Sequence, residues 1–168
     1  MRKLIVNPKA ELKIRVAMKH ADSLEIMWFG EIKQNKKGDF ILKDVFFPPQ
    51  KNKPAYVETD DDRYPKWQFE TFIKSNKQNQ IRLQGHTHPY FDTTPSSIDQ
   101  RQVNTFLEES KDYYIQMIVG NAHKPHCAMY TIDGHSEKIQ IVWQYTYKIK
   151  KIMEEMMNYE YNETPRLF

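Results

Sequence analysis

The sequence predicts a mixed α/β fold in which a curved sheet is flanked by helices. Segments rich in β-branched and aromatic residues recur between residues 26 and 145, and such segments are typical of strands. They alternate with stretches whose apolar residues are spaced three or four apart, which is typical of amphipathic helices. The chain has no internal repeat or low-complexity linker, and its 168 residues are enough to bury a hydrophobic core. We therefore expect one domain over residues 1–168.

The N-terminal part of the chain is predicted to contain a helix and a hairpin. Asn7 followed by Pro8 indicates a helix start, because proline is favoured at the first helical position. The apolar residues from 12 to 18 alternate with others, which taken alone favours a strand. Segments 26–34 and 39–47 predict two strands that a Lys-Lys-Gly-Asp turn joins into a hairpin.

The later elements follow the same two patterns. Further strands are predicted over 55–58, 81–85, 113–119, 128–132 and 139–145. Helical spacing of apolar residues predicts helices over 67–75, from Ser96 or Ser97 through Leu107, and over 148–159. The last helix would close the fold, so we expect residues 147–168 to form a C-terminal helix and tail.

The strongest indication of function lies in the sequence Gly-His-Thr-His-Pro-Tyr-Phe-Asp-Thr-Thr-Pro-Ser-Ser-Ile-Asp. His86 and His88 are two residues apart on an extended segment, so their imidazoles point to the same side. Asp99 would lie in the first turn of the next helix, where the helix dipole favours a carboxylate. Two imidazoles and one carboxylate leave a tetrahedral zinc ion with an open fourth position, which distinguishes a catalytic zinc site from a structural one.

This segment resembles the JAMM metalloprotease motif of the MPN (JAB/Mov34) domain family. The pattern of that motif is His-x-His, seven residues, Ser, two residues and Asp, and His86, His88, Ser96 and Asp99 match it in full. Prolines that often accompany the pattern are also present, one after the second histidine and one before the serine. The resemblance implies an MPN (cytidine-deaminase-like) fold of the compact prokaryotic or phage type, and it implies a helix after Asn7.

The family pattern also needs a glutamate upstream, just before an apolar run that ends in glycine. Glu25 fits this position, because Ile-Met-Trp-Phe-Gly follows it. Glu31 is a rival, since it follows Gly30 and would share a strand face with Glu25. Six residues span about 20 Å of extended chain, so only one of the two can reach the metal. The resemblance favours Glu25, and we expect Glu31 to be an exposed charge after the strand.

The resemblance implies a zinc-dependent metallopeptidase or isopeptidase. His86, His88 and Asp99 would hold Zn²⁺, which lowers the pKa of a bound water to about 7. Glu25 would take the proton of that water as general base and pass it to the leaving amine. Ser96 would donate a hydrogen bond to the developing oxyanion, the role that the family assigns to its serine. The substrate would be an amide or isopeptide bond in a peptide or protein, with ubiquitin-like proteins among the candidates.

Other functions stay open at this point. Many MPN domains are protein-interaction scaffolds, and this chain would then bind zinc without turnover. The same site would also suit a hydrolase of small-molecule amides. A zinc deaminase is excluded, because it requires Pro-Cys-x-x-Cys and the chain has one cysteine. We expect the walls of the substrate pocket to come from Tyr90, Phe91 and the segment 51–67.

A second group of ligand-type residues, His123, His126 and Cys127, is not expected to bind a metal. The three lie in Asn-Ala-His-Lys-Pro-His-Cys, which indicates a loop between two strands with Pro125 in it and no fourth ligand nearby. We expect turn residues and a buried thiol there.

Charge and composition limit the partners and the compartment. The 25 basic and 22 acidic residues give a net charge of +3, which is too mixed to indicate a nucleic-acid partner. No apolar run approaches the length of a membrane span, and the N-terminal apolar stretch is too short for a signal peptide. The single cysteine suits a reducing compartment, so we expect the protein in the cytoplasm.

Overall fold

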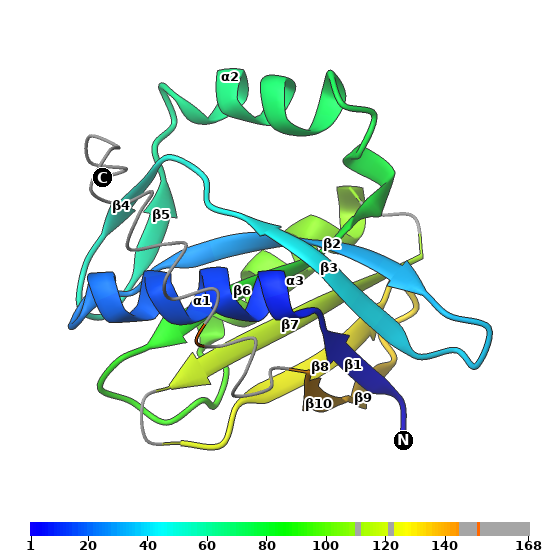
Figure 1. The fold of residues 1–168 in the computed structure, drawn as a ribbon. Coiled ribbons are helices and arrows are strands. Elements are labelled where there is room, and N and C mark those ends of the chain that lie inside the picture. The colour runs from blue at the N-terminus through cyan, green and yellow to red at the C-terminus, as the bar shows by residue number, and fades with distance from the viewer. Residues whose placement is uncertain (110–111, 121–122, 145–150, 152–168) are drawn as a thin grey trace.

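The computed structural model describes residues 1–109, 112–120, 123–144 and Lys151. Eight strands form one mixed sheet in the order β10-β1-β3-β2-β6-β7-β8-β9, and two short strands pair separately as a hairpin (Figure 1). The strands of the large sheet are β1 (Lys3–Val6), β2 (Met27–Gln34), β3 (Phe40–Phe46), β6 (Ile81–His88), β7 (Tyr113–Gly120), β8 (His126–Thr131), β9 (Ser136–Lys138) and β10 (Gln140–Trp143). The separate hairpin consists of β4 (Gln50–Asn52) and β5 (Val57–Thr59).

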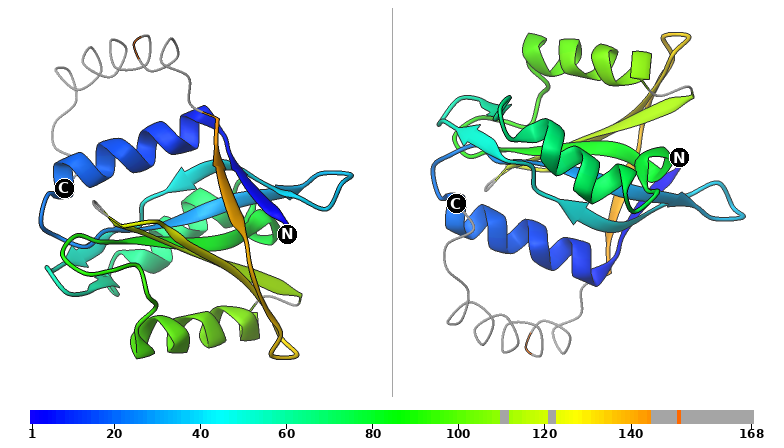
Figure 2. Two further views of the ribbon diagram at one scale, coloured as in Figure 1. Left: turned by 90° about the horizontal axis from the view of Figure 1, so that it is seen from below. Right: turned by 90° about the horizontal axis from the view of Figure 1, so that it is seen from above.

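Helices cover both faces of the large sheet. Figure 2 shows α1 (Pro8–Ala21) on one face and α3 (Ser97–Glu109) on the opposite face. A third helical segment consists of α2 (Tyr64–Gln68) and the π-helical turn η1 (Phe69–Ile73), and a short 3₁₀ turn, η2 (Gln78–Gln80), precedes β6. The prediction of a mixed α/β fold with a curved sheet flanked by helices is confirmed at this level. No helix in the described residues is long and apolar enough to cross a membrane.

The first helix forms although the apolar residues of its sequence alternate. The side chain of Asn7 caps the helix by accepting a hydrogen bond from the Lys9 N–H, and Pro8 occupies its first turn. Ala10, Ile14 and Ala17 are buried against the sheet, and their spacing is that of one helix face. The capping signal and this face therefore outweigh the alternation, and the predicted helix is confirmed.

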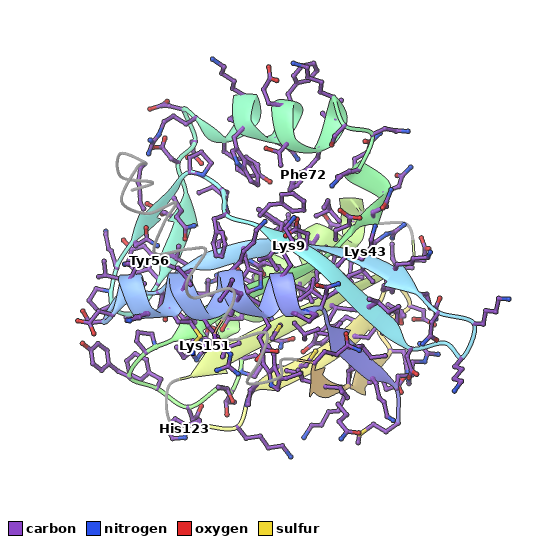
Figure 3. All side chains as sticks on the ribbon, viewed as in Figure 1. Lys9, Lys43, Tyr56, Phe72, His123 and Lys151 are labelled. Atoms are coloured by element: carbon purple, nitrogen blue, oxygen red, sulfur yellow. The ribbon has the colours of Figure 1, made fainter. Side chains whose placement is uncertain are left out.

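The two faces of the sheet have different cores. The face under α1 buries aliphatic side chains together with Trp28, which is fully buried. On the other face, the Phe29 ring contacts the rings of Tyr64, Trp67, Phe72 and Phe106, which come from α2, η1 and α3. Figure 3 shows Phe72 between this helical segment and the strands. Both faces of the central strands are thus covered, which keeps the end of β6 fixed in position.

Several predicted elements have different limits in the structure. The short strand β1 was not predicted, although Leu4 and Val6 are fully buried and pack in the core. The strand predicted over 139–145 is shorter in the structure, where β10 pairs with β1, and the unpredicted strand β9 comes just before it and pairs with β8. The predicted helix over 148–159, and the tail after it, lie outside the described residues except for Lys151.

Candidate metal centre

Two histidines stand at the C-terminal end of a central strand. His86 and His88 are the last alternate residues of β6, so their side chains lie on the same face of the sheet. His86 pairs with Met27 of β2 on one side and with Ile118 of β7 on the other. Both histidines are buried, and this face is the one that α3 covers. The prediction that the two imidazoles share one side of a strand is confirmed.

The donor atoms of His86, His88 and Asp99 converge. The two Nε2 atoms lie 3.1 Å apart, and the Nε2 atoms of His86 and His88 lie 3.2 Å and 3.8 Å from the carboxylate oxygens of Asp99. Zinc–nitrogen and zinc–oxygen bonds of about 2.0–2.1 Å give a tetrahedron with edges of about 3.3 Å. The three donors are close to that spacing, so this buried group could hold a metal ion. Among the described residues no other such cluster of histidine, cysteine and carboxylate is found.

The orientation of the His88 ring is fixed by a hydrogen bond at its second ring nitrogen, Nδ1. Its Nδ1 lies 2.7 Å from the backbone carbonyl oxygen of Asp92. A carbonyl oxygen only accepts hydrogen bonds, so Nδ1 must be the donor and the neutral ring presents the Nε2 lone pair to the cluster. Hydrogen bonds of this kind hold metal-binding histidines in the tautomer that can bind.

Asp99 and Ser96 form a reciprocal cap at the start of α3. The Ser96 N–H donates to an Asp99 carboxylate oxygen at 2.6 Å, and the Asp99 N–H donates to the Ser96 hydroxyl oxygen at 3.2 Å. Burial alone would raise the pKa of Asp99, but its contact with His86 and its bonds to Ser96 lower that pKa to about 2. Asp99 is therefore anionic at any ordinary pH and suited to a cation. The Ser96 hydroxyl oxygen accepts this bond, and a hydrogen bond from the Ser96 side chain to the Asp99 carboxylate contributes to the lowered pKa of Asp99.

Glu25 lies just before β2 and reaches the same site. It is 5 % exposed, and burial raises the pKa of its carboxyl to about 7, with the neighbouring His86 opposing the rise and the negative charge of Asp99 adding to it. A carboxyl that titrates near neutral pH can both take and give a proton under working conditions. Glu25 and the three donors all line one cavity of about 280 Å³.

The hairpin β4–β5 fixes the backbone around Glu25. The Glu25 N–H donates to the Lys53 carbonyl oxygen at 2.9 Å, and the Asn52 side-chain amide donates to the Glu25 carbonyl oxygen at 2.6 Å. The Gln50 side-chain amide hydrogen-bonds the Met27 backbone as the backbone of a paired strand would. It accepts from the Met27 N–H and donates to the Met27 carbonyl oxygen. Asn52 also donates to the Gln50 side chain at 3.0 Å, which joins the two contacts.

The sequence did not indicate Asn52 or Gln50 as site residues. They act through backbone atoms, so their residue types form no recognisable pattern with Glu25 along the chain. The expected pocket walls are present in part, since Phe91 and residues 55–57 line the cavity. Gln84 and Gln102 also line it and were not predicted; the Gln84 amide donates to the Gln102 side chain at 3.0 Å.

We expected Glu31 to be an exposed charge after the strand, and this expectation is wrong. Glu31 is not exposed and does not follow the strand: it is 3 % exposed within β2, where Lys43 and Lys77 each lie 2.9 Å from its carboxylate. Burial would raise the pKa of Glu31, but the hydrogen bonds and charges of the two lysines lower it. Glu31 pairs with Ile81 at the far end of β6 from the histidines, so it is a structural ion pair rather than part of the cluster.

The residues His123, His126 and Cys127 do not come together as ligands. His126 and Cys127 lie in β8 rather than in a turn, while His123 is exposed in the loop before it (Figure 3). Successive residues of a strand point to opposite faces, so His126 and Cys127 cannot converge on one ion. The Cys127 thiol is buried as expected, and burial raises its pKa to about 12.

Comparisons with known proteins show the fold and leave the activity open. No protein-family model matches the chain, and no curated protein matches it. Among solved structures, the chain is similar to the solution structure of protein DSY2949 from Desulfitobacterium hafniense, with a TM-score of 0.57 and 18% sequence identity. The similarity covers 85% of this chain and 94% of that one.

Proposed function

We propose that this protein is a zinc-dependent metallopeptidase or isopeptidase of the JAMM type, built on an MPN-like domain. The proposal depends on one observation above all. Three buried donors, two imidazoles and a carboxylate, lie at nearly tetrahedral spacing in a cavity that also contains a glutamate with a pKa of about 7. The order of these residues in the chain, and the serine beside Asp99, match the JAMM pattern.

The ligands in this proposal are His86, His88 and Asp99. Zinc bound there supplies a Lewis acid and a water whose pKa is near 7. His88 is held in the competent tautomer by Asp92, and Asp99 is held as an anion by the cap of α3. Both ligands are therefore oriented before a metal arrives, which reduces the cost of ordering them.

Glu25 is the general base of the proposed reaction. As a carboxylate it takes a proton from the attacking water, and as a carboxylic acid it delivers that proton to the leaving amine. A group with its usual low pKa would be too weak a base for the first step, and the raised pKa of Glu25 suits both. Burial leaves only 5 % of Glu25 exposed to solvent, and the hairpin fixes its backbone.

Ser96 is the proposed donor to the oxyanion. Its hydroxyl oxygen accepts from the Asp99 N–H, which fixes the side chain. Its proton, which bonds the Asp99 carboxylate in the resting site, would be donated to the carbonyl oxygen of the substrate as negative charge develops. The net reaction adds water across an amide or isopeptide bond and releases a carboxylate and an amine, with no covalent intermediate. The proposed substrate is a peptide or protein in the cytoplasm, and ubiquitin-like proteins belong to that class.

A hydrolase of small-molecule amides is the second candidate. It is favoured by the size of the cavity, because about 280 Å³ lies just below the range of typical small-ligand pockets. A zinc-binding scaffold without turnover explains the three donors equally well, but it gives no reason for a buried glutamate with a pKa near neutral beside them.

Metal analysis tests the first step of the proposal. We expect one zinc per chain in the purified wild type by elemental analysis, and loss of zinc in His88→Ala and Asp99→Ala. His135→Ala changes an exposed histidine far from the cluster in sequence and should keep the full metal content. Wild-type protein that takes up no zinc after reconstitution would remove the basis of the enzyme proposal. Zinc-loaded wild type that cleaves no peptide or isopeptide, with Glu25→Gln as inactive control, would favour the scaffold.

A further inference from the structure

Three large apolar side chains lie at the mouth of the metal cavity. Tyr56, Phe91 and Ile98 line the cavity, yet they are 37 %, 54 % and 49 % exposed to solvent. We call these three side chains the apolar rim. They come from three separate parts of the chain: the turn of the β4–β5 hairpin, the loop after β6 and the first turn of α3. The apolar rim therefore depends on how these three parts of the chain pack together, and it does not belong to a single loop.

Exposed apolar side chains are concentrated at this cavity. Of nine large apolar side chains that are exposed among the described residues, three form the apolar rim, and two more, Leu24 and Tyr90, directly adjoin lining residues in sequence. Two other hollows in the described part of the chain contain none of the nine; one lies beside α1 and Trp143, the other beside Arg2 and Glu137. Single exposed apolar residues are ordinary, whereas a group around one cavity marks a binding surface.

The charges in the cavity limit what can bind. Its lining contains the carboxylates of Glu25, Asp92 and Asp99, and it contains no lysine or arginine. The other two hollows each contain at least one arginine. Inside the cavity an acidic group of a ligand would meet Asp92 and no lysine or arginine, whereas Lys53 lies at the rim over the ring of Tyr56.

The cavity is large enough for the reacting amide group of a ligand but not for a whole peptide. A volume of about 280 Å³ has room for an amide bond and the atoms next to it. The three side chains of the apolar rim line this volume, yet each stays partly exposed to solvent. A small amide held inside would leave those exposed parts uncovered, whereas an extended chain through the cavity would cover them.

We propose that the apolar rim binds an extended polypeptide that has apolar side chains, and no acidic ones, on both sides of the amide at the metal centre. This inference rests on the proposed peptidase function and adds a substrate class to it. Phe91 and Ile98 act as contact surfaces that exclude water from the ligand's apolar side chains. The acidic lining disfavours ligands whose carboxylates would lie near Asp92, an exposed lining residue that is not a proposed zinc ligand.

Peptide binding to an inactive protein tests the inference without hydrolysis. Zinc-loaded Glu25→Gln is titrated with two fluorescent peptides, both acetylated and amidated, with leucine or with glutamate on either side of the central amide. We expect the leucine peptide to bind at least about tenfold more tightly. Phe91→Ser or Ile98→Ser, each added to Glu25→Gln, should weaken its binding at least about fivefold, which corresponds to a loss of about 1 kcal/mol. Ile132→Ser is the matched control, because Ile132 is 61 % exposed and does not line the cavity.

The outcomes separate this inference from the proposed function. Equal binding of the two peptides, binding of neither, or equal losses in Phe91→Ser and Ile132→Ser would overturn the inference. Preferred binding of the leucine peptide, together with zinc-loaded wild type that cleaves neither peptide, would support the rim and contradict the peptidase. Cleavage of both peptides at equal rates, unaffected by Phe91→Ser, would support the peptidase and contradict the rim.

Discussion

The side-chain amide of Asn52 donates a hydrogen bond to the backbone carbonyl of Glu25 across 2.6 Å. Glu25 precedes β2, so its carbonyl has no strand partner in the large sheet, and the hairpin supplies one. The same hairpin accepts the Glu25 N–H through Lys53. Both backbone polar groups of the proposed base are thus held by one element that lies outside the large sheet.

Removal of the Asn52 amide should therefore impair catalysis more than folding. We expect Asn52→Ala to keep its zinc but to lower kcat by about ten- to a hundredfold, since small displacements of a catalytic group have effects of this size. The measurement is steady-state kinetics well below the melting temperature, together with hydrogen exchange of the Glu25 N–H, which should become faster.

Asn35→Ala is the matched control for this variant. Asn35 accepts hydrogen bonds from the Lys37 and Asp39 N–H groups at the turn between β2 and β3, far along β2 from Glu25. It should lower stability without changing turnover. A normal kcat in Asn52→Ala would show that Asn52 supports the fold and does not position the base.

The raised pKa of Glu25 should be visible in the stability of the zinc-free protein. Between the usual pKa of about 4.5 and the folded value of about 7, the folded state holds a proton that the unfolded state has lost. The free energy of unfolding therefore falls as pH rises through this window, by up to about 3 kcal/mol, and stays low above it. Glu25→Gln removes this slope.

We expect Glu25→Gln to match the wild type near pH 4.5 and to be clearly more stable at pH 8. Denaturant unfolding of both proteins at several pH values measures the difference. Glu58→Gln, which changes an exposed glutamate on β5, should give no pH-dependent gain. Parallel stability curves for Glu25→Gln and the wild type would mean that Glu25 titrates as an ordinary surface carboxyl.

Gly85 is required by the tryptophan beneath it. A Cβ atom at this position would overlap the indole ring of Trp28, which is fully buried and pairs with Gly85 across β2 and β6. We expect Gly85→Ala to lower the free energy of unfolding by about 1–3 kcal/mol, as overpacking does, and to weaken zinc binding because His86 is the next residue. Chemical denaturation and zinc titration measure the two effects.

Two further variants separate overlap with Trp28 from a general cost of alanine. Gly120 lies opposite His88 in the pairing of β6 and β7. In Gly120→Ala the new Cβ atom would be 3.3 Å from the Thr93 side chain, so a small shift of that side chain should accommodate it. Trp28→Leu should relieve part of the Gly85→Ala cost in a double-mutant cycle. Additive losses in that cycle would contradict the overlap.

Local signals in the sequence predicted that the three donor residues converge. His86 and His88 needed only the two-residue period of a strand, and Asp99 needed only a helix start three residues earlier, so each follows from neighbours along the chain. The helix after Asn7 had a cap signal, but its alternating apolar residues favoured a strand, and the family resemblance decided the prediction. The positions of the three donor residues can be predicted from residues close to them in the sequence, without knowledge of the rest of the fold.

The remaining features depend on contacts between distant segments. Glu31 could not be recognised as buried, because its partners Lys43 and Lys77 come from two other segments and compensate its charge only after folding. The roles of Asn52 and Gln50 depend on where the hairpin packs. Three residues, Ser136–Lys138, form β9 although they lack any apolar pattern, since pairing with β8 alone defines them.

Ser96 has two roles that substitution can separate. As N-cap of α3 it accepts the Asp99 N–H, and as proposed oxyanion donor it would use its proton. Ser96→Gly removes the hydroxyl, yet glycine is a tolerated cap that costs only a few tenths of a kcal/mol. We therefore expect Ser96→Gly to keep its zinc and most of its stability while kcat falls about a hundredfold or more.

Ser96→Thr keeps both a cap and a hydroxyl, so it should recover much of the activity that Ser96→Gly loses. Steady-state kinetics, thermal melts and zinc analysis on the three proteins separate the roles. If the glycine variant instead loses zinc and turnover in proportion, then Ser96 acts only by holding Asp99 in place through the cap. A fully active glycine variant would assign the oxyanion to the metal centre without help from this hydroxyl.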